Sequence, residues 1–467
     1  MNRYTRNTRT TSVVLAALLG GLSSCGFFQT DKLVDPNNLS VASFVNNPTR
    51  DQLGLLAVGL QSAPRNGYLD LIRITASVGR EGIYSASTDN RYFTELLGTS
   101  ADAFGGSVDP NGIFNTYYTS FSNTRRQAEF FDRAAQSSTG SATSLTAAEK
   151  AGARGFARTM QGYAMLQLLN MQYKNGIRSG FTDLREPGDL LKPLKFTDYA
   201  GGLDLVIATL NEGATSLDAA GSTFAFASAF TSGWAGFNTP ATMKLVNRAL
   251  AARAYMYKQD WASMNTALSQ SFLNLSGDLN VGPKFNFANA QNDQTNALFQ
   301  NPDGNGAPYV LFDDVVTSAE PGDKRIATKT RQRTKARSSG GITSNYELQL
   351  YASNASPIGI IRNEELILMS AEAKAQLGDL AGATAAINVV RTSAGLAPYS
   401  GAATKNALIA EVLKQRRYSL LFEGHRWFDA RRYGLLNTLP NSTSPYKVFD
   451  SMVRPNAETA WEQANPQ

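Results

Sequence analysis

The sequence predicts a mainly α-helical protein with long loop insertions and little β-structure. Apolar residues recur with helical spacing over most of the chain, and some of these stretches begin with a Ser/Thr-x-x-Glu/Gln capping box. In addition, a helix pair in the middle of the chain is repeated near its end. Because such repeats are few and far apart, we expect a helical scaffold and not a regular solenoid.

The predicted helices follow one another from residue 49 onward. The first begins at the capping box Thr49–Gln52 and ends near Leu60, and the second carries the apolar residues between Leu69 and Val78. Another capping box, at 146–149, begins a helix whose apolar residues continue to Leu168 with i, i+3 and i+4 spacing. The remaining helices are predicted over 199–217, over 243–257 and in several segments between 362 and 433.

The repeated helix pair comprises residues 252–268 and 371–387, which correspond at an offset of 119 residues. Ala252 and Ala371 would let the paired helices approach closely, and Trp261 or Leu380 would fill the groove beside the turn. This arrangement is typical of tetratricopeptide-type helix pairs. Two unrelated helical hairpins remain the alternative.

Residues 277–357 interrupt the helical pattern with clusters of Gly, Pro and Asn. Within them, an alternation of Thr, Lys and Arg over Lys329–Arg337 predicts a short strand. The surrounding segment, Lys324–Arg337, is strongly basic but contains no aromatic residue, whereas a groove for single-stranded nucleic acid needs aromatic platforms. We therefore expect a solvated face or a contact with a membrane-associated partner, and no nucleic acid.

The amino terminus predicts export and lipid anchoring. Basic residues precede the apolar run 13–22, and small residues follow it, as in a secretory signal peptide covering residues 1–24. Cys25, the single cysteine, stands where a bacterial lipobox places its acylated residue; an ordinary signal peptide with a chance cysteine is the alternative. We expect residues 25–40 to form a tether and residues 41–467 the globular body, with no later membrane-spanning segment.

The composition excludes several classes of catalytic site. With Cys25 and His425 alone of their kinds, one chain cannot assemble a Cys/His zinc site, and we expect neither a metal nor a cofactor. The sequence contains neither a P-loop nor a Gly-x-Ser-x-Gly elbow. We therefore expect no enzymatic activity. The alternative is a glycosidase that uses a carboxylate pair such as Asp313–Asp314 or Glu364–Glu365.

The carboxy-terminal third carries a distinctive succession of short motifs. They are Arg362-Asn-Glu-Glu-Leu366, Ala371-Glu-Ala373, Leu377-Gly-Asp379, Gln415-Arg-Arg417, Glu423-Gly-His-Arg-Trp-Phe-Asp429 and Arg431-Arg-Tyr-Gly434. In this order and spacing, the chain resembles the SusD/RagB family of outer-membrane nutrient-binding lipoproteins.

The resemblance implies a SusD-like α/α superhelical fold, whose parts would be residues 41–276, the insertion 277–357 and the motif region 358–467. It also implies an outer-membrane protein facing the cell exterior, which captures an oligomeric nutrient and delivers it to a SusC-like TonB-dependent transporter. A glycan is the preferred ligand and a peptide the alternative. A tetratricopeptide-type adaptor without a small ligand is a further alternative.

We interpret the stretch 423–429 as structural and not as a binding site. On a continuous helix, Glu423 and Asp429 would each lie one turn from Arg426, so that these charges would pair. Trp427 requires burial, Gly424 would admit a neighbouring helix, and the lone His425 is expected to be a packed core residue.

Ligand contacts are expected from aromatic platforms that stand beside amide and hydroxyl groups on loops. The preferred cluster alternates polar and aromatic residues between 84 and 93, and further aromatic candidates lie on later loops. These residues are Tyr84, Asn90, Arg91, Tyr92 and Phe93, then Trp234 and Phe237, and finally Phe285 and Tyr309.

Overall fold

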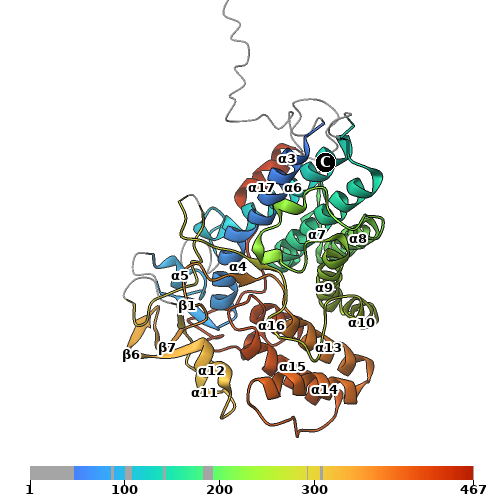
Figure 1. Ribbon diagram of the computed structural model, residues 1–467. Coiled ribbons are helices and arrows are strands. Elements are labelled where there is room, and N and C mark those ends of the chain that lie inside the picture. Colours follow the sequence, from blue (N-terminus) through green and yellow to red (C-terminus); the bar gives the residue numbers. More distant parts are fainter. Residues whose placement is uncertain are drawn as a thin grey trace, which may run out of the picture.

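The computed structural model confirms the mainly α-helical fold (Figure 1). It describes residues 47–85, 89–99, 108–139, 144–181, 193–291, 293–304 and 309–465. Cys25, the predicted signal peptide and the predicted tether lie outside the described residues. No helix in the described ranges has the length and apolar character needed to cross a bilayer.

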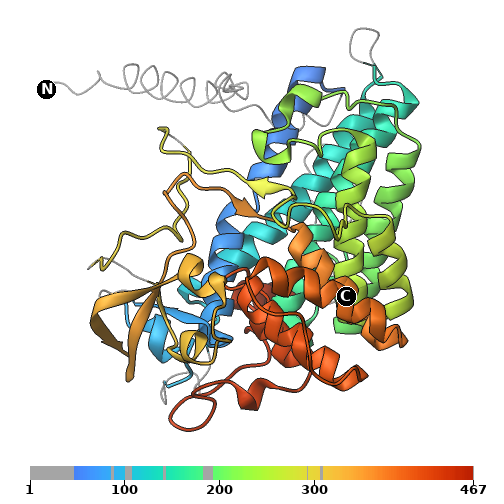
Figure 2. The same ribbon diagram turned by 60° about the horizontal axis from the view of Figure 1, so that its bottom comes forward.

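Long helices that follow one another along the chain pack side by side in the amino-terminal half (Figures 1 and 2). Both predicted capping boxes form, at Thr49 and Thr146. The close packing of α7 on α8 depends on glycine, because a Cβ atom at Gly155 would lie 2.5 Å from Leu217. The helices are α3 (Arg50–Ser62), α4 (Arg65–Val78), α6 (Thr116–Ser137), α7 (Ala147–Gln172), α8 (Tyr199–Asp218), α9 (Pro240–Lys258) and α10 (Trp261–Ser269).

The repeated helix pair is confirmed as two hairpins, α9–α10 and α13 (Asn363–Leu377) with α14 (Leu380–Ser393). Each first helix ends on a left-handed residue, Gln259 with φ +60° or Gly378 with φ +89°. The next residue is an aspartate in both cases, and its side chain caps the second helix by accepting a hydrogen bond from a backbone N–H three residues on. Because these turn residues correspond at the same offset of 119, the two hairpins share their turn chemistry.

A four-stranded antiparallel sheet, in the order β1-β5-β7-β6, lies at the periphery on the side away from α8–α10 (Figures 1 and 2). The strand predicted around 329–337 is confirmed as β6, which pairs with β7 across a two-glycine turn. Arg331 and Arg333 both form ion pairs with the buried Glu347, so the hairpin neutralises part of its own basic charge. The strands are β1 (Gly82–Tyr84), β5 (Tyr309–Leu311), β6 (Thr330–Ser339) and β7 (Ile342–Leu348).

The remaining helices and strands complete the fold around the long helices and the four-stranded sheet. They are α5 (Arg91–Thr94), α11 (Asp314–Thr317), α12 (Lys324–Lys329), α15 (Lys405–Ser419), α16 (Arg426–Arg432) and α17 (Asn456–Ala464), with the strand pairs β2 (Ile177–Arg178) and β3 (Phe196–Thr197), and β4 (Lys284–Phe285) and β8 (Ile358–Gly359).

The motif around residues 423–429 forms part of the hydrophobic core. Trp427 is fully buried, and its indole N–H donates to the Phe449 carbonyl oxygen over 2.7 Å. Gly424 has φ +84°, and a Cβ atom there would lie 2.8 Å from Leu71 on α4. His425 is also buried, and burial lowers its pKa to about 4 although Glu365 opposes this. The motif therefore joins α16 to α4, as expected of a structural segment.

The predicted partners of Glu423 and Asp429 were wrong. Glu423 pairs with Arg362 over 2.7 Å, and Asp429 pairs with Arg416 over 2.7 Å and with Arg432 over 2.9 Å. The prediction assumed a continuous helix from 423 to 429, whereas the chain turns through positive φ angles at 422 and 424 and α16 begins only at residue 426.

Candidate functional site

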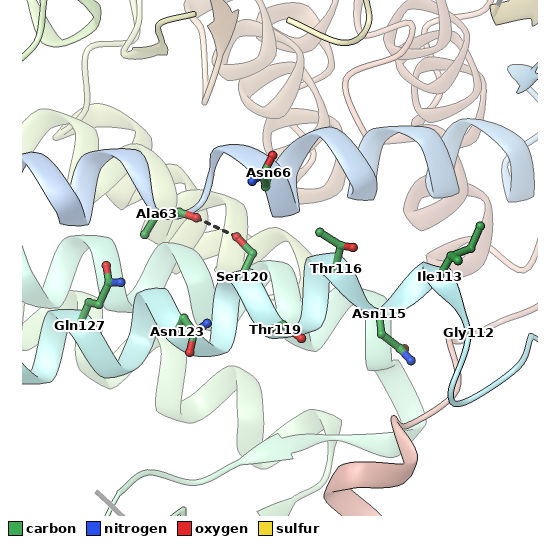
Figure 3. Close-up of a pocket in the computed structure, with 10 residues that line it drawn as sticks. All are labelled: Ala63, Asn66, Gly112, Ile113, Asn115, Thr116, Thr119, Ser120, Asn123 and Gln127. Atoms are coloured by element: carbon green, nitrogen blue, oxygen red, sulfur yellow. Dashed lines mark hydrogen bonds between the residues drawn. The ribbon is translucent and has the colours of Figure 1, made fainter. Parts of the chain in front are cut away.

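An open groove of about 540 Å³ lies between the start of α4 and the first turns of α6 (Figure 3). The connection between α3 and α4 closes one side, and the turn that precedes α6 closes one end. The lining residues are Ala63, Asn66, Gly112, Ile113, Asn115, Thr116, Thr119, Ser120, Asn123 and Gln127.

Seven of the ten lining residues carry an amide or hydroxyl side chain, and none is charged. Asn66, Asn115, Asn123 and Gln127 present amide groups, and two threonines and Ser120 present hydroxyl groups. Each amide or hydroxyl can both donate and accept a hydrogen bond. The groove therefore suits a ligand whose surface carries many neutral hydroxyl or amide groups.

Some lining groups hold the frame, and others face solvent. The Ser120 hydroxyl donates to the Ala63 carbonyl oxygen over 2.7 Å and so ties α6 to the end of α3 (Figure 3). By contrast, Thr116, Thr119 and Gln127 are exposed, and within the described part of the chain their side chains form no hydrogen bond. These groups are free to bind a ligand without breaking an internal contact.

A buried carboxyl group holds α4 against the first turn of α6. The Tyr117 backbone N–H donates to Oδ2 of Asp70 over 3.1 Å, and Asp70 lies inside the core. Burial raises the pKa of Asp70 to about 6, although the bond from Tyr117 opposes this shift. Asp70 positions the helix and does not line the groove.

A cluster of tyrosines adjoins the groove at the start of α6. The ring centroid of Tyr84 on β1 lies 4.7 Å from that of Tyr92 on α5 and 5.0 Å from that of Tyr309 on β5. Tyr92 in turn packs edge-on against Phe114 at 5.1 Å. Phe114 stands between two lining residues, Ile113 and Asn115, but its ring is buried, so the cluster meets the end of the groove from the core side.

The structure brings the preferred sequence-predicted cluster together around this point. Tyr84 and Tyr92 are half-buried, Asn90 is exposed, and Arg91 pairs with Asp89 over 2.7 Å. Phe93 is buried, in a separate small hydrophobic cluster. Tyr84, Asn90, Arg91 and Tyr92 therefore remain proposed ligand contacts.

The other sequence-predicted aromatic residues lie in the hydrophobic core. Trp234, Phe237, Phe285 and Tyr309 are between 1% and 6% exposed, so their rings offer no open face to a ligand. The first three pack on other aromatic rings of the core, and Tyr309 supports the tyrosine cluster from within. We do not retain these four residues as ligand contacts. The loop composition on which they were chosen gives no measure of burial.

Sequence reasoning missed the groove because it missed α6. Polar uncharged residues recur at 116, 119, 120, 123 and 127, which is helical spacing, while Tyr117, Phe121 and Ala128 occupy the opposite face. No side chain caps the amino-terminal end of this helix. The helical spacing of these amide and hydroxyl residues is the sequence signal that could have predicted both α6 and its polar face.

The acidic pairs considered for a glycosidase are engaged elsewhere. Asp313 accepts two hydrogen bonds from Asn345, and Asp314 pairs with Arg417. Burial raises the pKa of Glu365, but Arg253 outweighs this effect and lowers the pKa to about 2. In the same way, Arg362 lowers the pKa of Glu364 although burial raises it. A general acid needs a raised pKa, so neither glutamate fits that role.

Two further cavities are lined in part by charged side chains that form ion pairs. One of about 310 Å³ lies beside the Arg362–Glu423 ion pair, and one of about 500 Å³ lies beside the Lys174–Asp450 pair. No group of three or more His, Cys, Asp or Glu side chains in the described ranges is arranged to hold a metal ion.

The comparison with family models and the comparison with solved structures both point to SusD-like proteins. Residues 314–466 match the model of the SusD family. Surface glycan-binding protein A from Bacteroides thetaiotaomicron is similar at 12% identity, over 91% of this chain and 99% of that one, with a TM-score of 0.67. That protein also has a structure in complex with laminarihexaose.

Two further solved structures have the same fold. Surface glycan-binding protein A from Bacteroides uniformis is 15% identical over 87% of this chain and 98% of that one, with a TM-score of 0.63. NanU from B. fragilis is 16% identical over 91% and 94%, with a TM-score of 0.57. No curated protein matches the sequence.

Proposed function

Because residues 314–466 match the SusD family model, we propose that this chain is a non-enzymatic cell-surface protein of the SusD/RagB family that binds a glycan in the groove between α4 and α6. The observation that carries this proposal is the lining of the groove, in which amide and hydroxyl groups predominate and charge is absent. A saccharide offers hydroxyl groups over its whole surface, and such a lining can match them in either direction. The half-buried Tyr92 packs on Phe114 near the end of the groove.

The first test removes groove groups that hold no internal contact. We expect the double variant Thr119→Ala/Gln127→Ala to bind the glycan about 5- to 150-fold more weakly, because two hydrogen bonds of about 0.5–1.5 kcal/mol each are lost. Both positions are exposed on α6, and alanine favours helix, so the melting temperature should stay unchanged. Calorimetric titration with oligosaccharides selected on a glycan array measures the affinity.

The matched control is Asn265→Ala, which removes an exposed amide from α10, outside the groove. It should bind like the parent. Equal affinity of the groove variant and the parent would place the glycan elsewhere on the surface. If the pure protein released reducing ends from a polysaccharide, it would be a glycosidase and the proposal of a non-enzymatic binding protein would be wrong.

Membrane anchoring through Cys25 forms part of the proposal and rests on the lipobox-like sequence Leu22–Cys25. Several acyl chains, at about 0.8 kcal/mol per buried CH₂, would hold the protein on the outer membrane. Cys25→Ser should therefore release the protein from membranes in soluble form, as measured by fractionation and immunoblotting. A variant that still sediments with the outer membrane would contradict lipid anchoring.

We also propose a SusC-like TonB-dependent transporter as the protein partner, to which the captured glycan passes. Family resemblance supports this partner. The hairpins α9–α10 and α13–α14 offer it a helical surface of tetratricopeptide type, which is the observation that favours an adaptor role in addition to glycan binding. Extraction in mild detergent followed by affinity purification should recover a large β-barrel protein with this chain, and its absence would count against the partnership.

A further inference from the structure

We propose that Arg73 reads an acidic group on the bound glycan, so that the preferred ligand is a saccharide bearing carboxylates. This inference rests on the proposed glycan-binding function and adds a chemical class to it. It is carried by the surroundings of one guanidinium group and by its position relative to the groove.

The guanidinium of Arg73 lies within the tyrosine cluster. Its carbon is 5.1 Å from the ring centroid of Tyr84 and 5.9 Å from that of Tyr309, and its Nε donates to the Tyr309 hydroxyl over 2.6 Å. Among the described residues, its two terminal nitrogens donate to no protein atom, yet neither is closed off from solvent. Two parallel N–H donors are therefore held in place and remain available to a ligand.

Arg73 has no counter-ion in the described part of the chain, although acids are nearby. Asp70 stands one helical turn away but accepts its bond from the Tyr117 amide, and Asp89 is taken by Arg91. Neither forms an ion pair with Arg73, and the guanidinium keeps its full positive charge. A partly buried charge without a partner is costly, which is why such groups commonly mark sites of recognition.

Other buried arginines of this protein show how the fold normally satisfies that group. Arg253, Arg416 and Arg432 each pair with a carboxylate. Arg80, which has no carboxylate partner, donates instead to several backbone carbonyl oxygens. Arg73 has neither arrangement, because its one side-chain hydrogen bond in the described residues runs from Nε to the Tyr309 hydroxyl.

The position of Arg73 fits the recognition of a groove-bound ligand. Tyr84, which lies against the guanidinium, also packs on Tyr92, and Tyr92 packs on Phe114 at the end of the groove. The guanidinium of Arg337 adds positive charge close to the end of β1. It donates to Ser85, the residue after β1, and forms no ion pair in the described residues. A carboxylate matches the planar fork of a guanidinium in a bidentate geometry.

The experiment compares acidic oligosaccharides with the same chains after chemical reduction of their carboxyl groups. The probes are oligogalacturonate, oligoalginate and hyaluronate fragments, each beside its carboxyl-reduced form, together with a sulfated galactan and its desulfated form. We expect the parent to bind at least one carboxylate member ten-fold or more above its reduced form at low salt. The preference should shrink as salt rises, because the interaction is partly exposed.

Arg73→Gln is the test variant, and Arg126→Gln is the matched control, since Arg126 is an exposed arginine on α6 next to the lining residue Asn123. The acid preference should vanish in Arg73→Gln, while affinity for the reduced form stays within about two-fold of the parent. Arg126→Gln should keep the preference. If Arg73→Gln melts early, Arg73→Lys replaces it, and it should lose most of the preference because an ammonium lacks the fork.

The outcomes separate this inference from the function on which it rests. Equal binding of acidic and reduced forms, or a preference that survives in Arg73→Gln, would overturn the acidic-ligand inference and leave glycan binding in place. A preference for the sulfated probe alone would overturn the choice of a carboxylate. Binding of no saccharide, on an array of neutral and acidic glycans, would remove the proposed function itself.

Discussion

Replacing Glu365 with alanine is expected to lower the free energy of unfolding by about 3–5 kcal/mol, one of the two largest effects that we predict. Glu365 on α13 binds Arg253 on α9 through two hydrogen bonds of 2.7 and 2.6 Å, and the two side chains are only 2% and 4% exposed. Removal of the carboxylate leaves the Arg253 charge buried without a partner. The cost is a large share of a typical total stability of about 5–15 kcal/mol.

Urea unfolding followed by circular dichroism measures this change. The control is Asp218→Ala, which removes a surface ion pair with Lys244 whose side chains are 59% and 31% exposed. Exposed pairs contribute at most about 1 kcal/mol, so the control should unfold close to the parent. If Glu365→Ala and the control lose equal stability, the pair does not fix α9 to α13 as the structure indicates.

The second large effect concerns Glu81, whose carboxyl group is buried between α4 and β1. Burial raises its pKa to about 8, although Arg426 opposes the shift, and within the described residues its Oε2 has no hydrogen-bond partner. The folded protein therefore holds a proton that the unfolded chain, with a glutamate pKa near 4.3, has already released. Stability should fall by up to about 1.4 kcal/mol per pH unit as the pH rises from about 4.5 to about 8.

Glu81→Gln should remove this dependence because an amide stays neutral at every pH. We expect the variant to melt at the same temperature as the parent near pH 3.5, where Glu81 is protonated in both the folded and the unfolded chain, and several degrees higher at pH 8.5. Calorimetric melts across this range measure the difference. A variant that is less stable than the parent at pH 8.5 would show that Glu81 is ionised and paired in the folded state.

Much of the helical fold could be predicted because its information is local. The capping boxes at Thr49 and Thr146 and the repeated turns at 259–260 and 378–379 are contained in a few consecutive residues. The ion-pair partners could not be predicted in this way. Glu423 meets Arg362, which is 61 residues away, and a one-turn spacing rule cannot find such a contact.

The candidate site could be predicted only where polar and aromatic residues alternate on one short segment. Tyr84 and Tyr92 satisfy that condition, and the structure places them next to the groove. Arg73 lies inside a helix that was selected for its apolar residues, and its importance depends on Tyr309, which reaches it from a strand more than 200 residues later. The absence of a counter-ion is a property of three-dimensional surroundings and has no counterpart in the sequence.

β6, one of the two outer strands of the sheet, affects whether copies of this protein aggregate when they are crowded. β6 ends the strand order, so within the described residues one side of its backbone has no neighbouring strand. An open strand edge invites pairing with the same edge of another molecule and hence aggregation. Here the pairing register shifts between Gln332 and Arg337, and Lys335 is exposed in that interval. A kinked edge that carries positive charge repels an identical edge, which favours solubility of the monomer where many copies crowd together.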